Sequence, residues 1–175
     1  VVLMKSSNAE SIGTPLEALG VPVVYVDFET PEQYTRDLGT LGQLFGNEAR
    51  ARELIAYFQE RVERTTTALA GLEDARKPNV LLLYYSDRDG AVAFNVPPLG
   101  YIQSTLVELA GGRLAWRDAQ LGKGWTTVTL EQIAAWDPDQ VYVVSYVADV
   151  DDVVASLEAD PQWQALRAVG DGQLH

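Results

Sequence analysis

The sequence predicts an α/β fold in which two lobes are joined by a single long α-helix. Short apolar runs bounded by polar residues suit buried strands, and segments with helical spacing lie between them. One helical segment, from Asn47 to about Ala70, would span roughly 36 Å, which is too long for a crossover within one small sheet. Because strands and helices alternate, we expect each lobe to be a three-layer, Rossmann-like αβα structure with a mainly parallel sheet.

The first thirty residues predict a strand, a helix and a second strand. The apolar run Val1–Met4 suits a strand that is buried on both faces, and Ser7 or Asn8 could cap the helix that follows. That helix would turn Ile12, Leu16 and Leu19 inward and end at Gly20. The run Val21–Val26 then suits a second strand, which implies a right-handed parallel crossover.

Two helices are expected next. The first runs from Pro31, a favoured first helical residue, to Leu44, and Gly46 breaks it. Asn47 then caps the long helix, which Gly71 closes. Its apolar stripe has three- and four-residue spacing and consists of Ala51, Leu54, Ile55, Phe58, Val62, Ala68 and Leu69.

A second α/β pattern begins after the polar stretch Ala75–Asn79. Its expected strands are Val80–Tyr85, Ala91–Phe94 and Val141–Ser145. Its expected helices are Tyr101–Ala110, Leu130–Trp136, Val150–Leu157 and Pro161–Leu166. Turns are predicted at Ser86–Gly90 and at Asp171-Gly172.

Composition excludes several classes of function. The formal net charge is −12, which argues against nucleic acid and against anionic lipid surfaces, because both attract basic proteins. No apolar run approaches the roughly 18 residues of a membrane-spanning helix, so no direct membrane insertion is expected. There are no cysteines, which excludes disulfides and thiolate chemistry.

The residues offer little for catalysis. The single histidine, His175, is the last residue, and no phosphate-binding glycine loop or HExxH motif is present. Asp87, Asp89 and Gly90 resemble the start of a calcium loop, but position 12 would be Pro98, so we interpret them as a β-turn. We therefore expect no enzyme activity, no resident metal and no cofactor.

A ligand site is expected beyond the carboxyl ends of the strands, as in other open α/β sheets. Several aromatic side chains fall there, and Lys5, Arg88 and Arg117 could add positive charge, a combination that suits a bulky, partly apolar, anionic ligand. By their position at strand ends, the ligand-binding candidates are Lys5, Ser6, Asn8, Tyr85, Arg88, Asn95, Trp125 and Tyr146.

From residue 39 onward the sequence resembles the solute-binding proteins of ABC importers for iron–siderophores, haem and cobalamin. Residues 1–30 look like the second half of the amino-terminal lobe of these proteins. The segments that carry the resemblance are Asn8–Glu10, Leu19–Val23, Leu41–Glu48, Leu109–Gly112, Thr129–Val141 and Trp163–Leu174.

The resemblance implies a domain organisation. Residues 1–36 would be the second half of an incomplete amino-terminal lobe, residues 37–77 the connecting helix region, and residues 78–175 a carboxy-terminal lobe truncated at its end. A signal segment would lie outside this chain, and we expect a periplasmic protein or an extracellular, membrane-anchored lipoprotein. We expect a monomer.

The resemblance also implies partners. The ligand would be a metal chelate, with an iron–siderophore favoured over haem, cobalamin and molybdate, and the second partner would be an ABC permease. Family members dock on the permease through one glutamate in each lobe, and the matching motif here points to Glu131. A glutamate in the first turn of a helix is equally explained by the helix dipole. A doubly wound metabolic enzyme is the alternative from another class, although both strand exits lack its glycine-rich turn.

Overall fold

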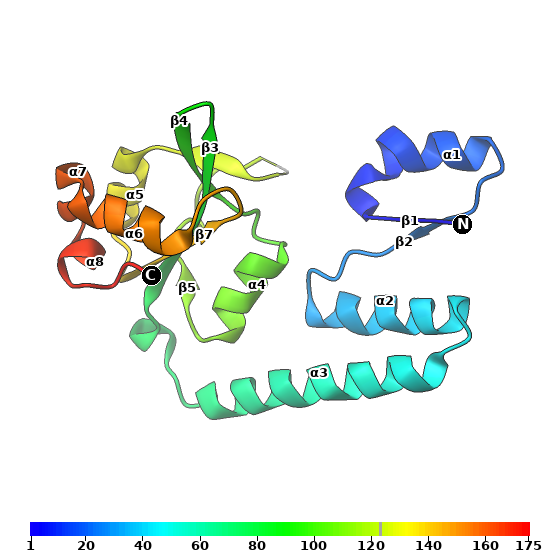
Figure 1. Cartoon of the computed structure of the whole chain (residues 1–175). Coiled ribbons are helices and arrows are strands. Elements are labelled where there is room, and N and C mark those ends of the chain that lie inside the picture. Colours follow the sequence, from blue (N-terminus) through cyan, green and yellow to red (C-terminus); the bar gives the residue numbers. More distant parts are fainter. Residues whose placement is uncertain (123) are drawn as a thin grey trace. The chain divides into compact units, whose positions relative to one another are not determined.

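The computed structural model describes residues 1–122 and 124–175. Contacts within the chain divide it into two compact units, Val1–Thr67 and Ala68–His175, which we call unit 1 and unit 2 (Figure 1). Both units combine helices with a sheet, so the predicted α/β class is confirmed. The predicted domain boundaries at residues 36 and 77 stay a prediction.

Unit 1 begins with two short parallel strands. Strand β1 (Val2–Met4) pairs with β2 (Val23–Tyr25), with Val2 opposite Val23. The parallel crossover is therefore confirmed. The prediction that the first strand is buried on both faces is wrong, because a two-stranded sheet offers little to pack against and Leu3 is 41% exposed.

The segment between these strands is less regular than predicted. It forms a 3₁₀ turn, η1 (Ser6–Asn8), a π turn, η2 (Ala9–Gly13), and the short helix α1 (Thr14–Ala18). The predicted side-chain cap is absent at Asn8, and Ile12 and Leu19 are exposed, because the extra residue of a π turn disrupts the spacing of one helical face. Gly13 lies against Tyr25, where any Cβ would collide with the tyrosine hydroxyl.

The two helices that follow are confirmed. Helix α2 (Pro31–Leu44) is capped by Thr30, whose side chain accepts a hydrogen bond from the Gln33 N–H, and α3 (Glu48–Leu69) is the long helix. Gly46 separates them with φ +61°, a conformation that favours glycine. Tyr34 of α2 stacks on Phe58 of α3 with ring centroids 4.1 Å apart.

The sheet of unit 2 is mixed, with the order β5-β3-β4-β6 and with β7 also pairing with β3. Strand β3 pairs in parallel with β5 and β7, whereas β3–β4 and β4–β6 are antiparallel. The strands are β3 (Asn79–Arg88), β4 (Ala91–Val96), β5 (Arg113–Leu114), β6 (Thr126–Val128) and β7 (Gln140–Ser145).

The antiparallel pairing follows from a tight turn at Asp89-Gly90. Both residues have positive φ, +53° and +83°, as the two-residue turns of β-hairpins require. The Asp87 carboxylate accepts a hydrogen bond from the Gly90 N–H at 2.8 Å. The predicted β-turn is thus confirmed, although β3 continues to Arg88, beyond the expected end at Tyr85.

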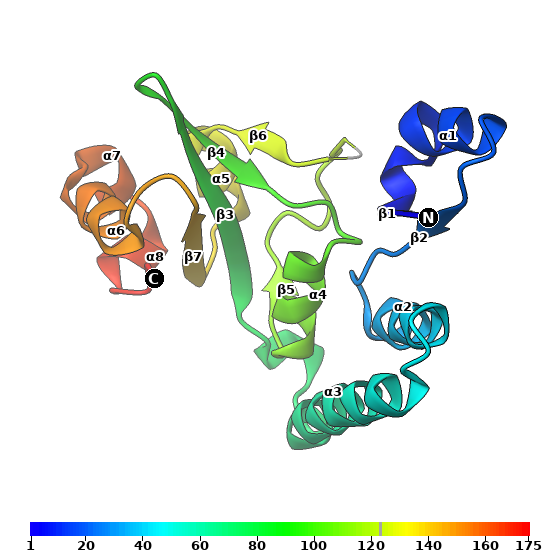
Figure 2. The ribbon, with the colours of Figure 1, turned by 45° about the vertical axis from the view of Figure 1, so that its right-hand side comes forward.

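Helices cover both faces of this sheet. In Figure 2, α4 lies on one side and α6, α7 and α8 on the other. The hydrophobic core contains Leu81 and Leu83 of β3, Ile133 and Trp163, all of which are buried. The unit 2 helices are α4 (Ile102–Leu109), α5 (Leu130–Trp136), α6 (Val150–Ala159), α7 (Pro161–Gln164) and α8 (Arg167–Gly170), and the short turn η3 (Asp74–Arg76) precedes β3.

The last residues of the chain join the sheet. Leu174 forms a parallel bridge to Val141 of β7, and the turn before it includes Gly172 at φ +68°. Over the described residues, no helix is both long enough and apolar enough to cross a membrane.

Candidate functional site

Unit 1 carries a polar cluster at the carboxyl ends of its two strands, which we call the rim. Because β1 and β2 are parallel, the residues that follow them lie at the same edge. Ser6 donates from its N–H and its hydroxyl to the Asp27 carboxylate, at 2.8 and 2.6 Å. Lys5 forms an ion pair with Glu29. The rim consists of Lys5, Ser6, Asp27, Glu29, Arg36 and Asp37.

Asp37 holds the loop of the rim in place. Its side chain is 1% exposed and accepts hydrogen bonds from the N–H groups of Asp27 and Phe28, at 2.7 and 3.1 Å. Arg36 donates to Asp37 at 2.6 Å and to Asp27 at 3.3 Å. A buried carboxylate is stable only when it is paired and hydrogen-bonded in this way.

Phe28 has an unusual backbone within this loop. Its φ of +57° lies in the left-handed region that non-glycine residues rarely adopt. The Asp37 carboxylate holds its N–H, and its ring meets Tyr34 edge-on with centroids 5.7 Å apart. Several contacts therefore determine the path of the loop from Asp27 to Glu29.

The electrostatics of the rim favour ionised aspartates. Burial opposes the charged form of Asp37, but hydrogen bonds from Arg36 and the two N–H groups outweigh it and hold its pKa below the ordinary value. Burial also opposes ionisation of Asp27, yet hydrogen bonds from Ser6 and Arg36 lower its pKa overall. The hydrogen bond to Asp37 raises the pKa of Arg36. Asp27, Arg36 and Asp37 therefore form a network of charged groups at neutral pH.

Two of the three candidates in unit 1 belong to the rim, namely Lys5 and Ser6. Asn8 ends η1 and is exposed, and its backbone N–H donates to the Lys5 carbonyl. Sequence reasoning missed Asp27, although it directly follows a predicted strand as Lys5 does, and Glu29, which lies two residues further on. Arg36 and Asp37 lie inside a helix, where no local signal marks them.

Unit 2 has a hollow of about 510 Å³ on the face of the sheet near the β3–β4 hairpin. Strand register explains its lining: Tyr84 lies opposite Asn95, and Asn95 lies opposite Thr127. Ser86 lies opposite Ala93, and these side chains share one face because strands alternate. The lining is Tyr84, Ser86, Arg88, Ala91, Ala93, Asn95, Trp125 and Thr127.

Three aromatic rings gather at this hollow. Tyr84 meets Trp125 edge-on at 5.5 Å between centroids and lies 5.6 Å from Tyr146 in a tilted arrangement. Tyr146 is 76% exposed, whereas Trp125 and Tyr84 are half-buried. Exposed rings at the mouth of a hollow can stack on a flat or apolar ligand.

The polar lining of the hollow is mostly uncharged. Thr127 donates to the Asn95 side-chain carbonyl at 2.7 Å, and the Asn95 amide donates to the Ser86 hydroxyl at 3.2 Å. This chain of hydrogen bonds orients the Asn95 amide and two hydroxyls on one face. Among the described residues that line the hollow, Arg88, near the hairpin turn, is the one cation.

The structure brings four of the five unit 2 candidates to this region. Arg88, Asn95 and Trp125 line the hollow, and Tyr146 joins it through Tyr84. Tyr85 points to the opposite face, where it contacts Phe94 at 6.0 Å between centroids and packs against the core, so we replace it with Tyr84. Neighbouring residues of a strand point to opposite faces of the sheet. Sequence alone therefore does not tell which of Tyr84 and Tyr85 faces the hollow until the buried face is known.

Arg117 does not belong to the hollow. It lines a separate depression of about 360 Å³ together with Arg113 and Asp118, beside β5. Arg117 and Arg88 therefore line different depressions of unit 2, and the expectation that both add charge to one ligand site stays a prediction.

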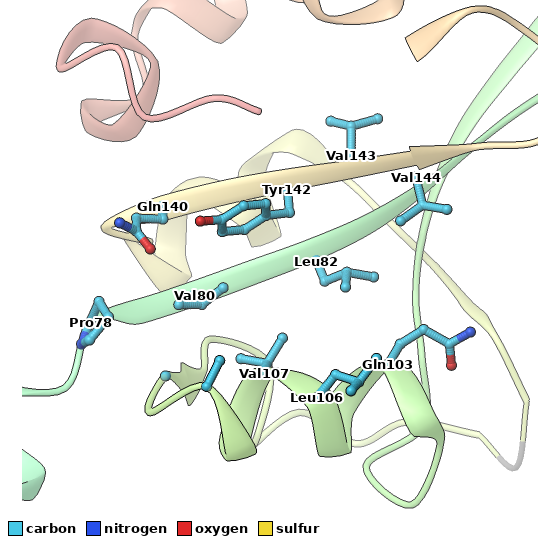
Figure 3. A pocket seen from close by; sticks show the side chains of 12 residues that line it. Pro78, Val80, Leu82, Gln103, Leu106, Val107, Gln140, Tyr142, Val143 and Val144 are labelled. Carbon is cyan, nitrogen blue, oxygen red and sulfur yellow. The ribbon is translucent and has the colours of Figure 1, made fainter. Parts of the chain in front are cut away.

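A different groove of about 480 Å³ lies between α4 and the strands β3 and β7. Figure 3 shows Leu106 and Val107 of α4 on one side of it and Val80, Leu82 and Tyr142 on the other. Its lining is mainly apolar and contains no charged side chain, so it offers a ligand little for orientation. We therefore take the hollow as the candidate site of unit 2.

Glu131 lies in the first turn of α5 and is exposed. It lies within a capping box: the Thr129 hydroxyl accepts a hydrogen bond from the Gln132 N–H at 3.3 Å, and the Gln132 side chain accepts one from the Thr129 N–H at 2.9 Å. A hydrogen bond with the Thr129 side chain lowers the pKa of Glu131, which keeps it charged at neutral pH. Glu131 therefore presents a negative charge at the surface of unit 2, where another molecule could contact it.

The chain belongs to the periplasmic binding protein family, which matches it over residues 1–175. This is a family of binding proteins, in line with the expectation that the chain is not an enzyme. The sequence is 24% identical over 158 residues to the iron-uptake system-binding protein of Bacillus subtilis (strain 168), a match that covers 89% of this chain. The chain spans only 47% of that protein.

Solved structures show the same fold. S. aureus IsdE complexed with heme matches with a TM-score of 0.77 and 17% identity, over 99% of this chain and 66% of that one. The triscatecholate siderophore-binding protein FeuA from Bacillus subtilis, complexed with ferri-bacillibactin, matches with a TM-score of 0.71 and 21% identity, over 99% and 59%. At these identities the likeness concerns the fold alone.

Proposed function

We propose that the chain is part of the solute-binding component of an ABC importer, which captures a metal chelate such as an iron–siderophore and delivers it to a permease. The observation that carries this proposal is the hollow of unit 2, where Trp125, Tyr84 and Tyr146 surround an oriented set of neutral hydrogen-bonding groups. Its volume of about 510 Å³ suits a bulky organic ligand better than a small oxyanion such as molybdate.

The relatives support the class of ligand. One relative is named for iron uptake, and the two solved structures are complexes with haem and with a ferric siderophore. Haem is the second candidate, because the exposed phenol of Tyr146 could serve as an axial oxygen ligand to iron. Cobalamin remains a third candidate within the same fold.

Tryptophan fluorescence tests this function. Trp125 lines the hollow, Trp116 and Trp163 are 0% and 4% exposed, and Trp136 lines a separate depression. A ligand in the hollow should therefore quench Trp125 most strongly. The chain is titrated with ferric siderophores, haem, cobalamin and molybdate, beside a Trp125→Phe variant that should lose the signal. Absence of saturable binding for every ligand would overturn the proposal.

The second part of the proposal, delivery to the permease, concerns Glu131. We propose that its charge contacts basic residues of the permease, and that the protein acts in the periplasm or on the outer face of the membrane. In the full-length protein, Glu131→Gln should reduce ligand-dependent stimulation of a reconstituted permease and leave ligand affinity unchanged. Glu158→Gln, which changes an exposed glutamate on α6, is the matched control. If both variants stimulated the permease equally, Glu131 would have no role in docking.

A further inference from the structure

Two arginines of unit 2 lie at the end of the sheet opposite the hollow. Arg113 begins β5 opposite Asn79, the first residue of β3, and Arg117 follows in the turn after β5. Both arginines line the depression of about 360 Å³, and both also line a smaller one of about 90 Å³. We call these two depressions the arginine pocket. Since a strand rises by about 3.3 Å per residue, the length of β3 places it roughly 30 Å from the hairpin turn near the hollow.

The backbone that carries the two arginines is firmly held. The Arg113 N–H donates to the Pro78 carbonyl at 2.8 Å, which fixes the start of β5 beside β3. Between the arginines, Trp116 is 0% exposed, and its indole N–H donates to the Pro97 carbonyl at 2.8 Å. This buried anchor fixes the turn from which Arg117 projects. Both side chains therefore start from positions that need no rearrangement to receive a ligand.

The guanidinium groups of both arginines lack ion-pair partners among the described residues. Neither pairs with a carboxylate, although the sequence contains 25 acidic residues. The Nε of Arg113 is inaccessible to solvent and has no hydrogen-bond partner within the part of the chain that the structure describes. Buried N–H groups are nearly always satisfied in proteins, so this one marks a position where an acceptor from another molecule fits.

Three carboxylates border the arginine pocket without engaging its arginines. Asp118 lines the larger depression, and Asp74 and Glu108 line the smaller one. Asp74 pairs with Lys77 at 3.2 Å. Asp118 and Glu108 are exposed and form no ion pair with either arginine. Exposed carboxylates that remain unpaired are solvated by water and compete only weakly for a guanidinium.

Asp139, which precedes β7, is engaged by other groups. One oxygen accepts a hydrogen bond from the Asn79 N–H at 2.6 Å, and the other pairs with Arg167 at 2.9 Å. The pKa of Asp139 is lowered first by the Asn79 N–H, next by Arg167 and least by Arg113. Asp139 is therefore only a remote partner of Arg113, whose guanidinium stays available to a ligand.

We propose that the arginine pocket binds a phosphate group, either free phosphate or a small phosphate monoester, between Arg113 and Arg117. A guanidinium presents paired N–H donors that match phosphate oxygens, and two of them balance the charge of a phosphate dianion. The bound phosphate gives the Arg113 Nε–H the acceptor that it lacks. The proposal does not rest on the proposed function, because the arginine pocket and the hollow lie at opposite ends of β3.

Nuclear magnetic resonance of the whole chain tests this site. Inorganic phosphate and glycerol phosphate are titrated separately at constant ionic strength, so that screening does not change. The Nε–H signal of Arg113 and the indole N–H signal of Trp136, which also lines the larger depression, should shift saturably. We expect a Kd below about 10 mM for at least one of the two probes.

Matched variants connect the signal to the arginine pair. Arg117 is exposed, so Arg117→Gln should keep the fold and weaken phosphate binding at least about fivefold. Arg113→Lys keeps the charge but removes the Nε–H and the paired donors, and it should also weaken binding. Arg76→Gln changes an exposed arginine of η3 that lines neither depression and should leave the affinity unchanged.

The outcomes separate this site from the hollow. Saturable shifts that Arg117→Gln weakens and Arg76→Gln does not weaken support the proposal, and the probe that binds more tightly identifies the source of the phosphate. The absence of saturable shifts up to about 50 mM of either probe overturns the proposal. Equal weakening by Arg117→Gln and Arg76→Gln overturns it as well, because it would reveal a general charge effect. Neither negative result affects chelate binding in the hollow.

Discussion

The rim of unit 1 and the hollow of unit 2 are built by different means. In the rim, charged side chains of α2 fix the loop that follows β2, above all through the buried carboxylate of Asp37. In the hollow, the register of β3, β4 and β6 alone brings Tyr84, Asn95 and Thr127 into line. The comparison teaches that the rim depends on ionisation and the hollow on strand pairing.

The two regions can be probed separately. All four tryptophans lie in unit 2, at positions 116, 125, 136 and 163, so tryptophan fluorescence reports unit 2 alone. Far-UV circular dichroism reports the helices of both units, including the long α3 of unit 1. Differences between the two signals therefore show which unit a change affects.

The largest expected effect comes from removing the buried carboxylate of the rim. Asp37→Ala leaves two loop N–H groups without their acceptor, removes one of the two carboxylates that pair with Arg36, and should destabilise unit 1 by about 3 kcal/mol. In urea, the transition seen by circular dichroism should move to lower denaturant, while that of tryptophan fluorescence stays in place. The exposed pair of Arg50 and Glu53 supplies the control, Glu53→Ala, which should shift neither. Equal shifts of the two urea transitions would contradict the expectation that the rim stabilises unit 1 without affecting unit 2.

Acid should remove part of the same stabilisation. The folded-state pKa values of Asp27 and Asp37 lie below their ordinary values, so their contribution is fully present above about pH 4 and is lost as pH falls further. The circular-dichroism midpoint should therefore decrease between pH 5 and pH 3. Asp37→Asn should show a smaller decrease than the wild type. Asp139 of unit 2 also has a lowered pKa, mainly through the Asn79 N–H, so the tryptophan signal will respond as well.

In the hollow, removing an aromatic ring should affect binding more than stability. Trp125→Ala deletes a half-buried ring that contacts Tyr84 and should weaken the affinity for the chelate by about tenfold. Isothermal titration calorimetry measures this without a tryptophan signal. Tyr142→Ala, on the same sheet but in the apolar groove, is the control and should keep full affinity. Equal losses in the two variants would mean that the hollow is not the binding surface.

The smallest effect is expected at the capping box before α5. Thr129→Ala removes the acceptor for the Gln132 N–H and should destabilise unit 2 by about 1 kcal/mol. The urea midpoint measured by tryptophan fluorescence should decrease, and thermal unfolding gives an independent check. Thr129→Ser keeps the acceptor and should retain most of the stability. No difference between these two variants would show that the cap is dispensable.

Much of the fold could be predicted from the spacing of apolar residues and from the residues that begin and end helices. Helix α2 begins and ends where Pro31 and Leu44 were expected, and α3 ends within one residue of its predicted limit. The irregular turns after β1 could not be predicted, because they depend on the packing of Gly13 against Tyr25, which lies on a distant strand. The antiparallel strands β4 and β6 also depend on long-range pairing, although the turn between β3 and β4 was visible in the sequence.

The candidate site was predictable only in part. Residues that directly follow a strand, such as Lys5 and Ser6, could be found by position. The choice between Tyr84 and Tyr85 required knowledge of which face packs against Phe94 and the core. Asp37 lies in the interior of a helix, and its role arises from N–H groups nine and ten residues earlier in the chain.

The way in which Asp37 holds its loop has a consequence for the substitutions that the loop can accept. It binds the backbone N–H groups of positions 27 and 28, which every residue except proline supplies. Position 29, which follows directly, presents the carboxylate beside Lys5. The side chain at that position can therefore be exchanged by substitution while the hydrogen bonds that fix the main-chain path are kept, so the charge of the rim and the shape of its loop can be altered independently.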